Sequence, residues 1–426
     1  MRTYASATSV AIGALLAAGI AGAASAQEVR IYCDDTGFGC QTMQPVADRF
    51  NAEHPGMTVN LELVNYQNLL ESLPVQLASG EGPDGAMISD LGGLSRYYLD
   101  LTPYVDADRF NHDYERTLRW LRGLDQDSDA INGMPTQLTV NGAYVNLTLF
   151  EQAGVPVPEE GATWEEWAEA TRKVAEATGT DFAMEMDRSG HRFASLAISY
   201  GAELVGDDGR PAIDDGLRKA VEQFVAWHDD GTMPMDLWGA VGGATHRELF
   251  SDFLNADVVF YFGGSWTLNR LDKEIGDLFD WEVAPAPCGP SSCTVMPGGN
   301  ALVAFKSSQH PEVIGAFIDY LSQPENLTEV LQASVELPAA RTLQDEGIEY
   351  PGASKQTQDA LKTYTAQVPK MADAAYRFQG WRYQRAMMNA LTTRISQVLN
   401  HELDVDAALE RVAQDVNLAI DAAESN

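Results

Sequence analysis

Basic residues are scarce in this chain. Its 426 residues include 28 lysines and arginines against 62 aspartates and glutamates, which gives a formal net charge of −34. A chain this acidic is repelled by phosphate backbones and by anionic lipid surfaces. We therefore expect neither nucleic acid nor a membrane surface as a partner, and we interpret the excess charge as solvated surface.

Long apolar runs are missing after residue 26. No later segment approaches the roughly 18 consecutive apolar residues of a membrane-spanning helix, so no insertion into a membrane is expected. Within residues 1–26, Arg2 precedes a run of small and apolar residues from Val10 to Ala24, and Ala24-Ser25-Ala26 provides the small residues that signal peptidase needs. This pattern predicts a signal peptide over residues 1–26, cut after Ala26, and a periplasmic mature protein.

Motifs that carry enzyme chemistry are absent as well. The sequence has no His-Glu-x-x-His, no Gly-x-Ser-x-Gly and no phosphate-binding loop ending in Gly-Lys-Ser or Gly-Lys-Thr. Its seven histidines form no metal-ligand pair at helical spacing. We expect a protein that is not an enzyme and holds no cofactor and no metal. A periplasmic carbohydrate-active enzyme that uses paired carboxylates is the alternative from another class.

Only four cysteines are present, in two close pairs, Cys33 with Cys40 and Cys288 with Cys293. In an exported protein, such pairs predict two local disulfides that staple loops. A zinc site is the competing interpretation, but no nearby histidine completes a tetrahedral set of ligands.

Strand and helix periodicities alternate along the first hundred residues. Short apolar or alternating segments predict strands at 29–32, 57–63 and 86–89, and apolar residues at helical spacing lie between them. Further strands are expected at 142–147, 257–262 and 301–305, and Thr163 with Glu166 forms a capping box that opens a helix. This order predicts an α/β fold with parallel strands, and no linker separates independent domains.

Several segments, in their order, carry a family resemblance. They read VADRFNAEHP from Val46, QLASGEGPD from Gln76, YVNLTLFEQAGV from Tyr144, TWEEW from Thr163, FGGSW from Phe262, PGGN from Pro297, LPAAR from Leu337 and GWRYQRA from Gly380. Together they span nearly the whole chain after residue 26. The chain resembles family 1 extracellular solute-binding proteins, the group that contains maltose-binding and glycerol-3-phosphate-binding proteins.

The resemblance implies a periplasmic-binding-protein fold of two lobes (type II-like), each a mostly parallel sheet flanked by helices, with the ligand cleft at the hinge. One lobe would comprise residues 27–137 and 297–338, and the other residues 138–296 and 339–426. A monomer is expected to capture a carbohydrate or polyol between the lobes and deliver it to the membrane permease subunits of an ABC importer. Binding of an anionic solute, such as a sugar phosphate or sulfonate, and service to a chemoreceptor are the alternatives.

Loops at the carboxyl ends of the predicted strands provide the candidate ligand contacts. In the first lobe these are Asp35, Thr36, Phe38, Gln67 and Asp90, although Asp90 could equally cap the following helix. In the second lobe and at the return to the first we expect contacts from Asp187, Trp238, Gly264, Ser265, Trp266, Gly299 and Asn300. The indoles would stack on sugar faces and the polar groups would meet hydroxyls.

Trp381 and Arg382 lie where similar proteins carry a cleft aromatic or a ligand-binding arginine. The indole suits a sugar, whereas the guanidinium would clamp an anionic group. Other arginines lie nearby in sequence or could approach in space, namely Arg188, Arg192, Arg377 and Arg385. Several arginines at one cleft would favour an anionic ligand, and the alternative is that they pair with surface carboxylates.

Overall fold

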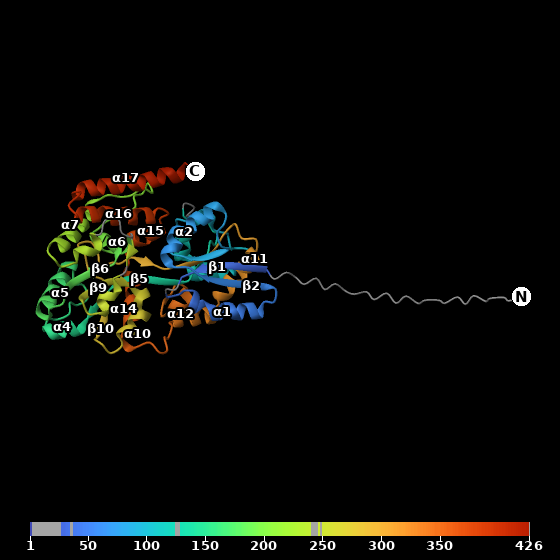
Figure 1. Cartoon of the computed structure of the whole chain (residues 1–426), viewed down its shortest axis with the longest axis horizontal. Coiled ribbons are helices and arrows are strands. Elements are labelled where there is room, and N and C mark those ends of the chain that lie inside the picture. The colour runs from blue at the N-terminus through green and yellow to red at the C-terminus, as the bar shows by residue number, and fades with distance from the viewer. Residues whose placement is uncertain (2–26, 35–36, 124–127, 240–245, 248, 426) are drawn as a thin grey trace.

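A computed structural model describes Met1 and residues 27–34, 37–123, 128–239, 246–247 and 249–425. Within these residues the chain forms two main sheets, each with helices around it, and strand β5 runs between the two halves (Figure 1). The predicted α/β fold of two sheets is confirmed. The predicted signal peptide, Asp35 and Thr36 lie outside the described residues.

The first sheet has the strand order β2-β1-β3-β12-β4. Its strands are β1 (Gln27–Cys33), β2 (Met57–Leu63), β3 (Gly85–Ile88), β4 (Met134–Pro135) and β12 (Ala301–Ala304). The helices of this half are α1 (Cys40–Glu53), α2 (Tyr66–Ser79), α3 (Ala107–Leu118), α11 (Pro311–Leu321) and α12 (Pro324–Ser334). Pro311 starts α11 at its first turn, where the missing N–H of proline removes no helical hydrogen bond.

The second sheet has the order β10-β5-β9-β6. Its strands are β5 (Gln137–Asn146), β6 (Phe182–Met186), β9 (Val258–Gly264) and β10 (Trp281–Ala284). The helices before β9 are α4 (Leu147–Ala153), α5 (Trp164–Thr178), α6 (Gly190–Ser199), α7 (Asp215–Asp229), α8 (Met235–Trp238) and α9 (Phe250–Leu254), and α10 (Leu268–Ile275) follows it. The short strands β7 (Arg188–Ser189) and β8 (His246–Arg247) pair with each other outside this sheet.

The expectation of mostly parallel sheets needs a correction, because both sheets are mixed. β1 pairs in parallel with β2 and β3, and β6 with β9, but β5 and β12 form antiparallel pairs with all their neighbours in the two main sheets. The reason is the end of the sheet at which each strand begins. Strands joined by helical crossovers end toward the middle of the molecule, whereas β5 and β12 begin there and run outward.

Three segments meet where the halves join. β11 (Pro297–Gly298) pairs with β5 at Val140 and Thr139, and β13 (Leu337–Pro338) pairs with β5 at Leu138 and Gln137. The start of β5 is therefore held on both sides by segments that pass between the halves. This fixes the backbone at the place where the candidate site lies.

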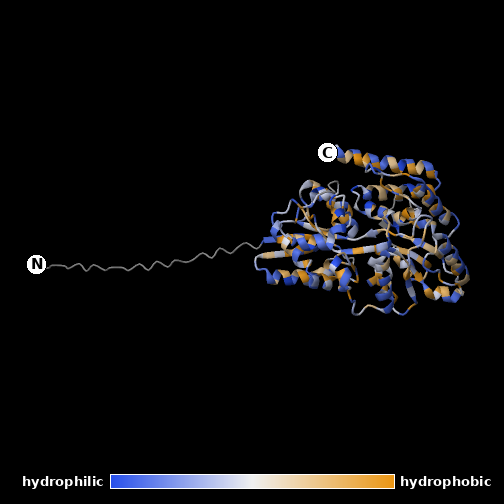
Figure 2. Cartoon of the chain, turned by 180° about the vertical axis from the view of Figure 1, so that it is seen from behind, coloured by the Kyte–Doolittle hydropathy of each residue, from blue (hydrophilic) through white to orange (hydrophobic). Residues whose placement is uncertain are grey.

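The remainder of the chain is helical. It comprises α13 (Arg341–Glu346), α14 (Lys355–Gln367), α15 (Asp373–Gly380), α16 (Gln384–Leu399) and α17 (Val405–Glu424). α17 buries Leu409, Val412, Val416 and Ile420 along one face, as their spacing predicts, and packs on α16. In Figure 2 this helix shows hydrophobic and hydrophilic residues in alternation along its length.

Local predictions at helix ends and cysteines are confirmed. At the start of α5, Thr163 Oγ1 accepts from Glu166 N at 3.1 Å, and Thr163 N donates to Glu166 Oε2 at 2.8 Å. Disulfides join Cys33 to Cys40 and Cys288 to Cys293, so these thiols cannot bind zinc. Within the described part of the chain, no helix is both long and apolar enough to cross a membrane.

Candidate functional site

A cavity of about 110 Å³ lies where the two halves meet. Its lining comes from loops of the first half, from the start of β5, from the second half and from the C-terminal helices. The lining residues are Tyr66, Ser89, Gln137, Thr139, Ser189, His191, Arg192, Trp266, Gly298, Gly299, Asn300, Glu336, Gln379, Gln384, Arg385 and Met388. A volume of this size exceeds what one water molecule needs and suits a small polar solute.

β5 places amide and hydroxyl groups on the cavity wall. Gln137 and Thr139 line the cavity, while Leu138 between them lines a separate groove of about 950 Å³. Successive side chains of a strand point to opposite faces, so the cavity and the groove lie on opposite sides of this strand. Gly299 packs closely against it: a Cβ at Gly299 would lie 2.1 Å from Gln137 O, and its φ is +143°, so another residue would be strained there.

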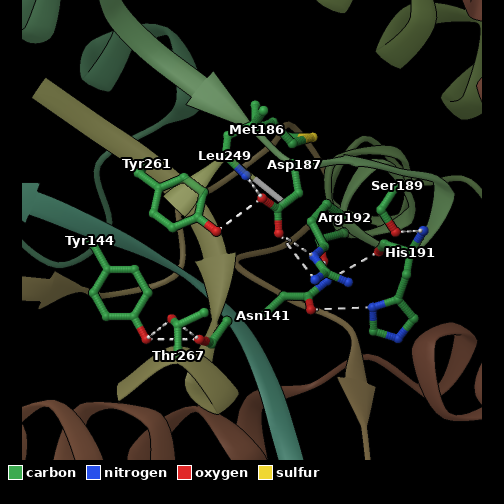
Figure 3. A network of polar contacts seen from close by, with 12 residues as sticks. Asn141, Tyr144, Met186, Asp187, Ser189, His191, Arg192, Leu249, Tyr261 and Thr267 are labelled. Carbon is green, nitrogen blue, oxygen red and sulfur yellow. Dashed lines mark hydrogen bonds and ion pairs between the residues drawn. The ribbon is translucent and has the colours of Figure 1, made fainter. Parts of the chain in front are cut away.

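A buried ion pair shapes the wall formed by the second half (Figure 3). Arg192, in the first turns of α6, donates from Nε to Asp187 Oδ2 at 3.2 Å, and its Nη2 lies 3.1 Å from the same oxygen. Asp187 Oδ1 accepts from Leu249 N and from the Tyr261 hydroxyl, both at 2.9 Å. The aspartate therefore neutralises the guanidinium and fixes its direction.

Trp266 supplies the aromatic surface of the cavity. It follows β9 in the short 3₁₀ helix Ser265–Thr267, and the Arg192 guanidinium lies 4.0 Å from the centroid of its ring. A Cβ at Gly264 would lie 1.8 Å from the same ring, so only glycine allows the indole this position. The Ser265 hydroxyl accepts from Val140 N at 3.2 Å, which ties the segment to β5.

His191 is half-buried and lies among polar groups of several segments. Its Nε2 lies 3.1 Å from both Pro297 O and Gln379 Oε1, and its Nδ1 lies 3.2 Å from Asn141 Oδ1. Burial, and then the positive charge of Arg192, lower its pKa to about 3. His191 is therefore uncharged at neutral pH, so its single ring N–H can donate either from Nε2 to Pro297 O and Gln379 Oε1 or from Nδ1 to Asn141 Oδ1.

Glu336 contributes a carboxyl group to the cavity lining. Its side chain is 1% exposed, and its Oε2 has no hydrogen-bond partner within the described residues. Burial, and secondarily the nearby Asp34, raise its pKa to about 8, so it is mostly protonated at neutral pH. A protonated carboxyl can both donate and accept, which suits a ligand hydroxyl.

Three predicted site residues line the cavity, and several others lie next to it. Trp266, Gly299 and Asn300 line it directly. Asp187 pairs with the lining residue Arg192, Ser265 accepts from Val140 N, and Gly264 lies against the Trp266 ring. Asp90 lines a small recess that shares Tyr66, Ser89 and Arg385 with the cavity, and burial raises its pKa. Gln67 follows Tyr66 but pairs through its amide with Glu71.

Four predicted residues lie away from the cavity. Phe38 is fully buried in the core, and Trp238 is 1% exposed with its indole N–H donating to Met186 O. The Trp381 indole donates to Gly209 O at 2.9 Å and lines a different groove, and the Arg382 guanidinium lies 5.7 Å from the ring centroid of Tyr383. The contacts of these four side chains are therefore with residues outside the cavity.

Sequence reasoning did not single out His191, Glu336, Gln379 and Gln384, which the fold brings to the cavity. For Arg192 and Arg385 the sequence indicates only that they could lie near the cleft. One signal was available: Glu336 is the single charged residue in the apolar stretch Val335-Glu336-Leu337-Pro338, where a carboxyl is seldom buried without a role.

Comparisons with known proteins agree with this architecture. The family model described as bacterial extracellular solute-binding protein matches residues 40–328. A binding protein of Brucella abortus is 24% identical over 321 residues, covering 72% of this chain and 74% of that protein. The maltodextrin-binding protein MdxE of Bacillus subtilis is 24% identical over 355 residues, covering 78% and 79%.

Among solved structures, the ABC substrate-binding protein Lmo0181 of Listeria monocytogenes, in complex with cycloalternan, superposes with a TM-score of 0.76. It is 17% identical, and the match covers 92% of this chain and 98% of that one. Such a likeness establishes the shared fold, and the family model covers more than half of the sequence. The chain therefore belongs to the family of bacterial extracellular solute-binding proteins.

Proposed function

We propose that this protein is the exported solute-binding component of an ABC importer and that it captures a carbohydrate or related polyol in the cavity between its halves. One observation carries the proposal: the cavity combines an aromatic ring, Trp266, with neutral planar amides from both halves, including Gln137, Asn300 and Gln384. Aromatic faces and planar hydrogen-bonding groups are the two elements that recognise sugar rings and hydroxyls.

The names of similar proteins support the same ligand class. The Bacillus subtilis relative is named for maltodextrin, and the Listeria monocytogenes structure holds cycloalternan. Capture without a covalent step fits a chain whose family consists of binding proteins. Export through a signal peptide cut after Ala26, and delivery of the solute to a membrane permease, complete the proposed role.

We expect Trp266→Ala to weaken carbohydrate binding by about 5- to 150-fold, which corresponds to the roughly 1–3 kcal/mol that an aromatic contact contributes. Thermal shifts against neutral sugars, polyols and sugar acids would first identify a ligand, and titration calorimetry would then measure its affinity. Trp381→Ala is the matched control, because its indole lies outside the cavity and should leave affinity unchanged. Equal affinities of wild type and Trp266→Ala, or no binding of any carbohydrate or polyol, would contradict the proposal.

Closure of two lobes on the solute is a second part of the proposed function. The lobes would comprise residues 27–137 with 297–338 and residues 138–296 with 339–426, hinged at the start of β5. Small-angle scattering should then report a smaller radius of gyration when a ligand identified by calorimetry is added. An identical scattering curve with and without that ligand would rule out closure.

A further inference from the structure

Arg385 lines the cavity, and within the described residues its Nε has no hydrogen-bond acceptor. It lies in the first turn of α16 and lines both the cavity and the adjoining recess. Its Nε is buried without a hydrogen-bond partner, and among the described residues no carboxylate forms an ion pair with its guanidinium. A buried N–H of a charged group costs free energy when it has no hydrogen-bond acceptor. The Arg385 guanidinium is therefore suited to bind an acceptor group of a ligand.

Among the described residues, no carboxylate lies within ion-pair distance of this guanidinium. Arg192, the other arginine of the cavity, already pairs with Asp187 at 3.1 Å. Asp90 in the recess lies close enough to Arg385 for that charge to lower its pKa, although burial raises the pKa overall, and no ion pair joins the two side chains. In a chain with a formal charge of −34, the cavity is thus lined by one cation that forms no ion pair within the described residues.

Glu336 is the second unsatisfied group of the cavity lining. Its side chain is 1% exposed and its Oε2 has no partner within the described part of the chain. Hydroxyl groups could donate to and accept from this carboxyl. The cavity thus offers a lone guanidinium for an anion and a buried carboxyl for hydroxyls.

We infer that the solute is a sugar acid, with its carboxylate on Arg385 and its hydroxyls on Glu336 and the cavity amides. This inference rests on the proposed function and narrows its ligand class. A carboxylate fits better than a phosphate ester because one unpaired guanidinium matches one negative charge and a planar pair of oxygens. A phosphate carries up to two charges and three acceptor oxygens, whereas the only other cation among the described lining residues, Arg192, already pairs with Asp187.

Calorimetry with matched ligands tests the inference. D-Glucuronate and D-galacturonate differ from D-glucose and D-galactose only at C6. Glucose 6-phosphate represents the phosphate esters. Each acid and each neutral sugar is tested as the monosaccharide and, where a corresponding disaccharide exists, as the disaccharide. In the wild type, an acid should bind at least about 10-fold more tightly than its neutral partner, and Arg385→Gln should weaken the acid by about 10- to 100-fold with little effect on the neutral sugar. Arg382→Gln is the control three residues away, outside the cavity.

The outcomes separate this inference from the proposed function. Neutral sugars that bind as tightly as the acids, or a phosphate ester that binds more tightly, would overturn the sugar acid and leave carbohydrate capture standing. Equal losses for acid and neutral sugar in a folded Arg385→Gln would assign Arg385 to hydroxyl binding and overturn the inference as well. If no sugar of either kind bound, the proposed function itself would fail. Thermal melts of both variants establish that they are folded.

Discussion

Replacing Asp187 by Ala is expected to destabilise the protein by about 3–5 kcal/mol, because the change leaves a buried charge without its partner. The side chains of Asp187 and Arg192 are 0% and 7% exposed. Removal of the carboxylate would also strand Leu249 N and the Tyr261 hydroxyl, which both donate to it at 2.9 Å. Urea denaturation at neutral pH would measure the difference in the free energy of unfolding.

Two further variants make this expectation specific. Glu169→Ala removes an exposed ion pair with Lys173 one helical turn away, and should change stability by less than about 1 kcal/mol. Replacing Asp187 and Arg192 together by neutral residues should recover part of the loss, because no unpaired charge then stays buried. A loss below about 1 kcal/mol for Asp187→Ala alone would show that Arg192 finds another partner or water.

Stability should be nearly level between about pH 4.5 and 6.5 and should then fall toward pH 8. Burial raises the pKa of Glu185 to about 9 and that of Glu336 to about 8, from ordinary values of 4.5. The folded protein keeps these protons while the unfolded chain releases them, so their contribution is fully present below pH 4.5 and is lost as the pH rises. Burial also lowers the pKa of His191 to about 3 and of His228 to about 4, from 6.5, which opposes this trend below pH 6.5.

Above pH 6.5 the contribution of the two histidines is complete, while Glu185 and Glu336 continue to act. Each should lower stability by on the order of 2 kcal/mol between pH 6.5 and 8, since one pKa unit corresponds to about 1.4 kcal/mol. Glu185→Gln and Glu336→Gln remove the titrating group at nearly constant size, so melts from pH 5 to 9 should be flatter for each variant and flattest for the double variant. A double variant with the wild-type slope would locate the pH dependence elsewhere.

Much of the fold is predictable because its signals are local. The capping box of Thr163 and Glu166, the apolar face of α17 and the paired cysteines each depend on residues only a few positions apart. Strand direction is less local. The sequences of β5 and β12 predict strands but not their direction. Both strands are antiparallel to their neighbours because they begin where the chain crosses from one half to the other.

The candidate site was predictable only where a loop follows a strand directly. Trp266, Gly299 and Asn300 come from such places and line the cavity. Trp381 and Trp238 have the right residue type, but their indole N–H groups donate to distant backbone carbonyls, Gly209 O and Met186 O, that turn them elsewhere. Glu336 directly precedes β13 and Gln379 lies in α15, and the periodicity of each segment does not predict that their side chains meet at the cavity.

The two disulfides have a consequence for the biogenesis of the protein. Four thiols can pair in three ways, and in this chain the native way joins cysteines separated by only 7 and 5 positions. Short loops close fastest and with the least loss of chain entropy, so the first bonds that an oxidant makes in the nascent polypeptide are the correct ones. Maturation should therefore need an oxidase but no isomerase to reshuffle mispaired bridges.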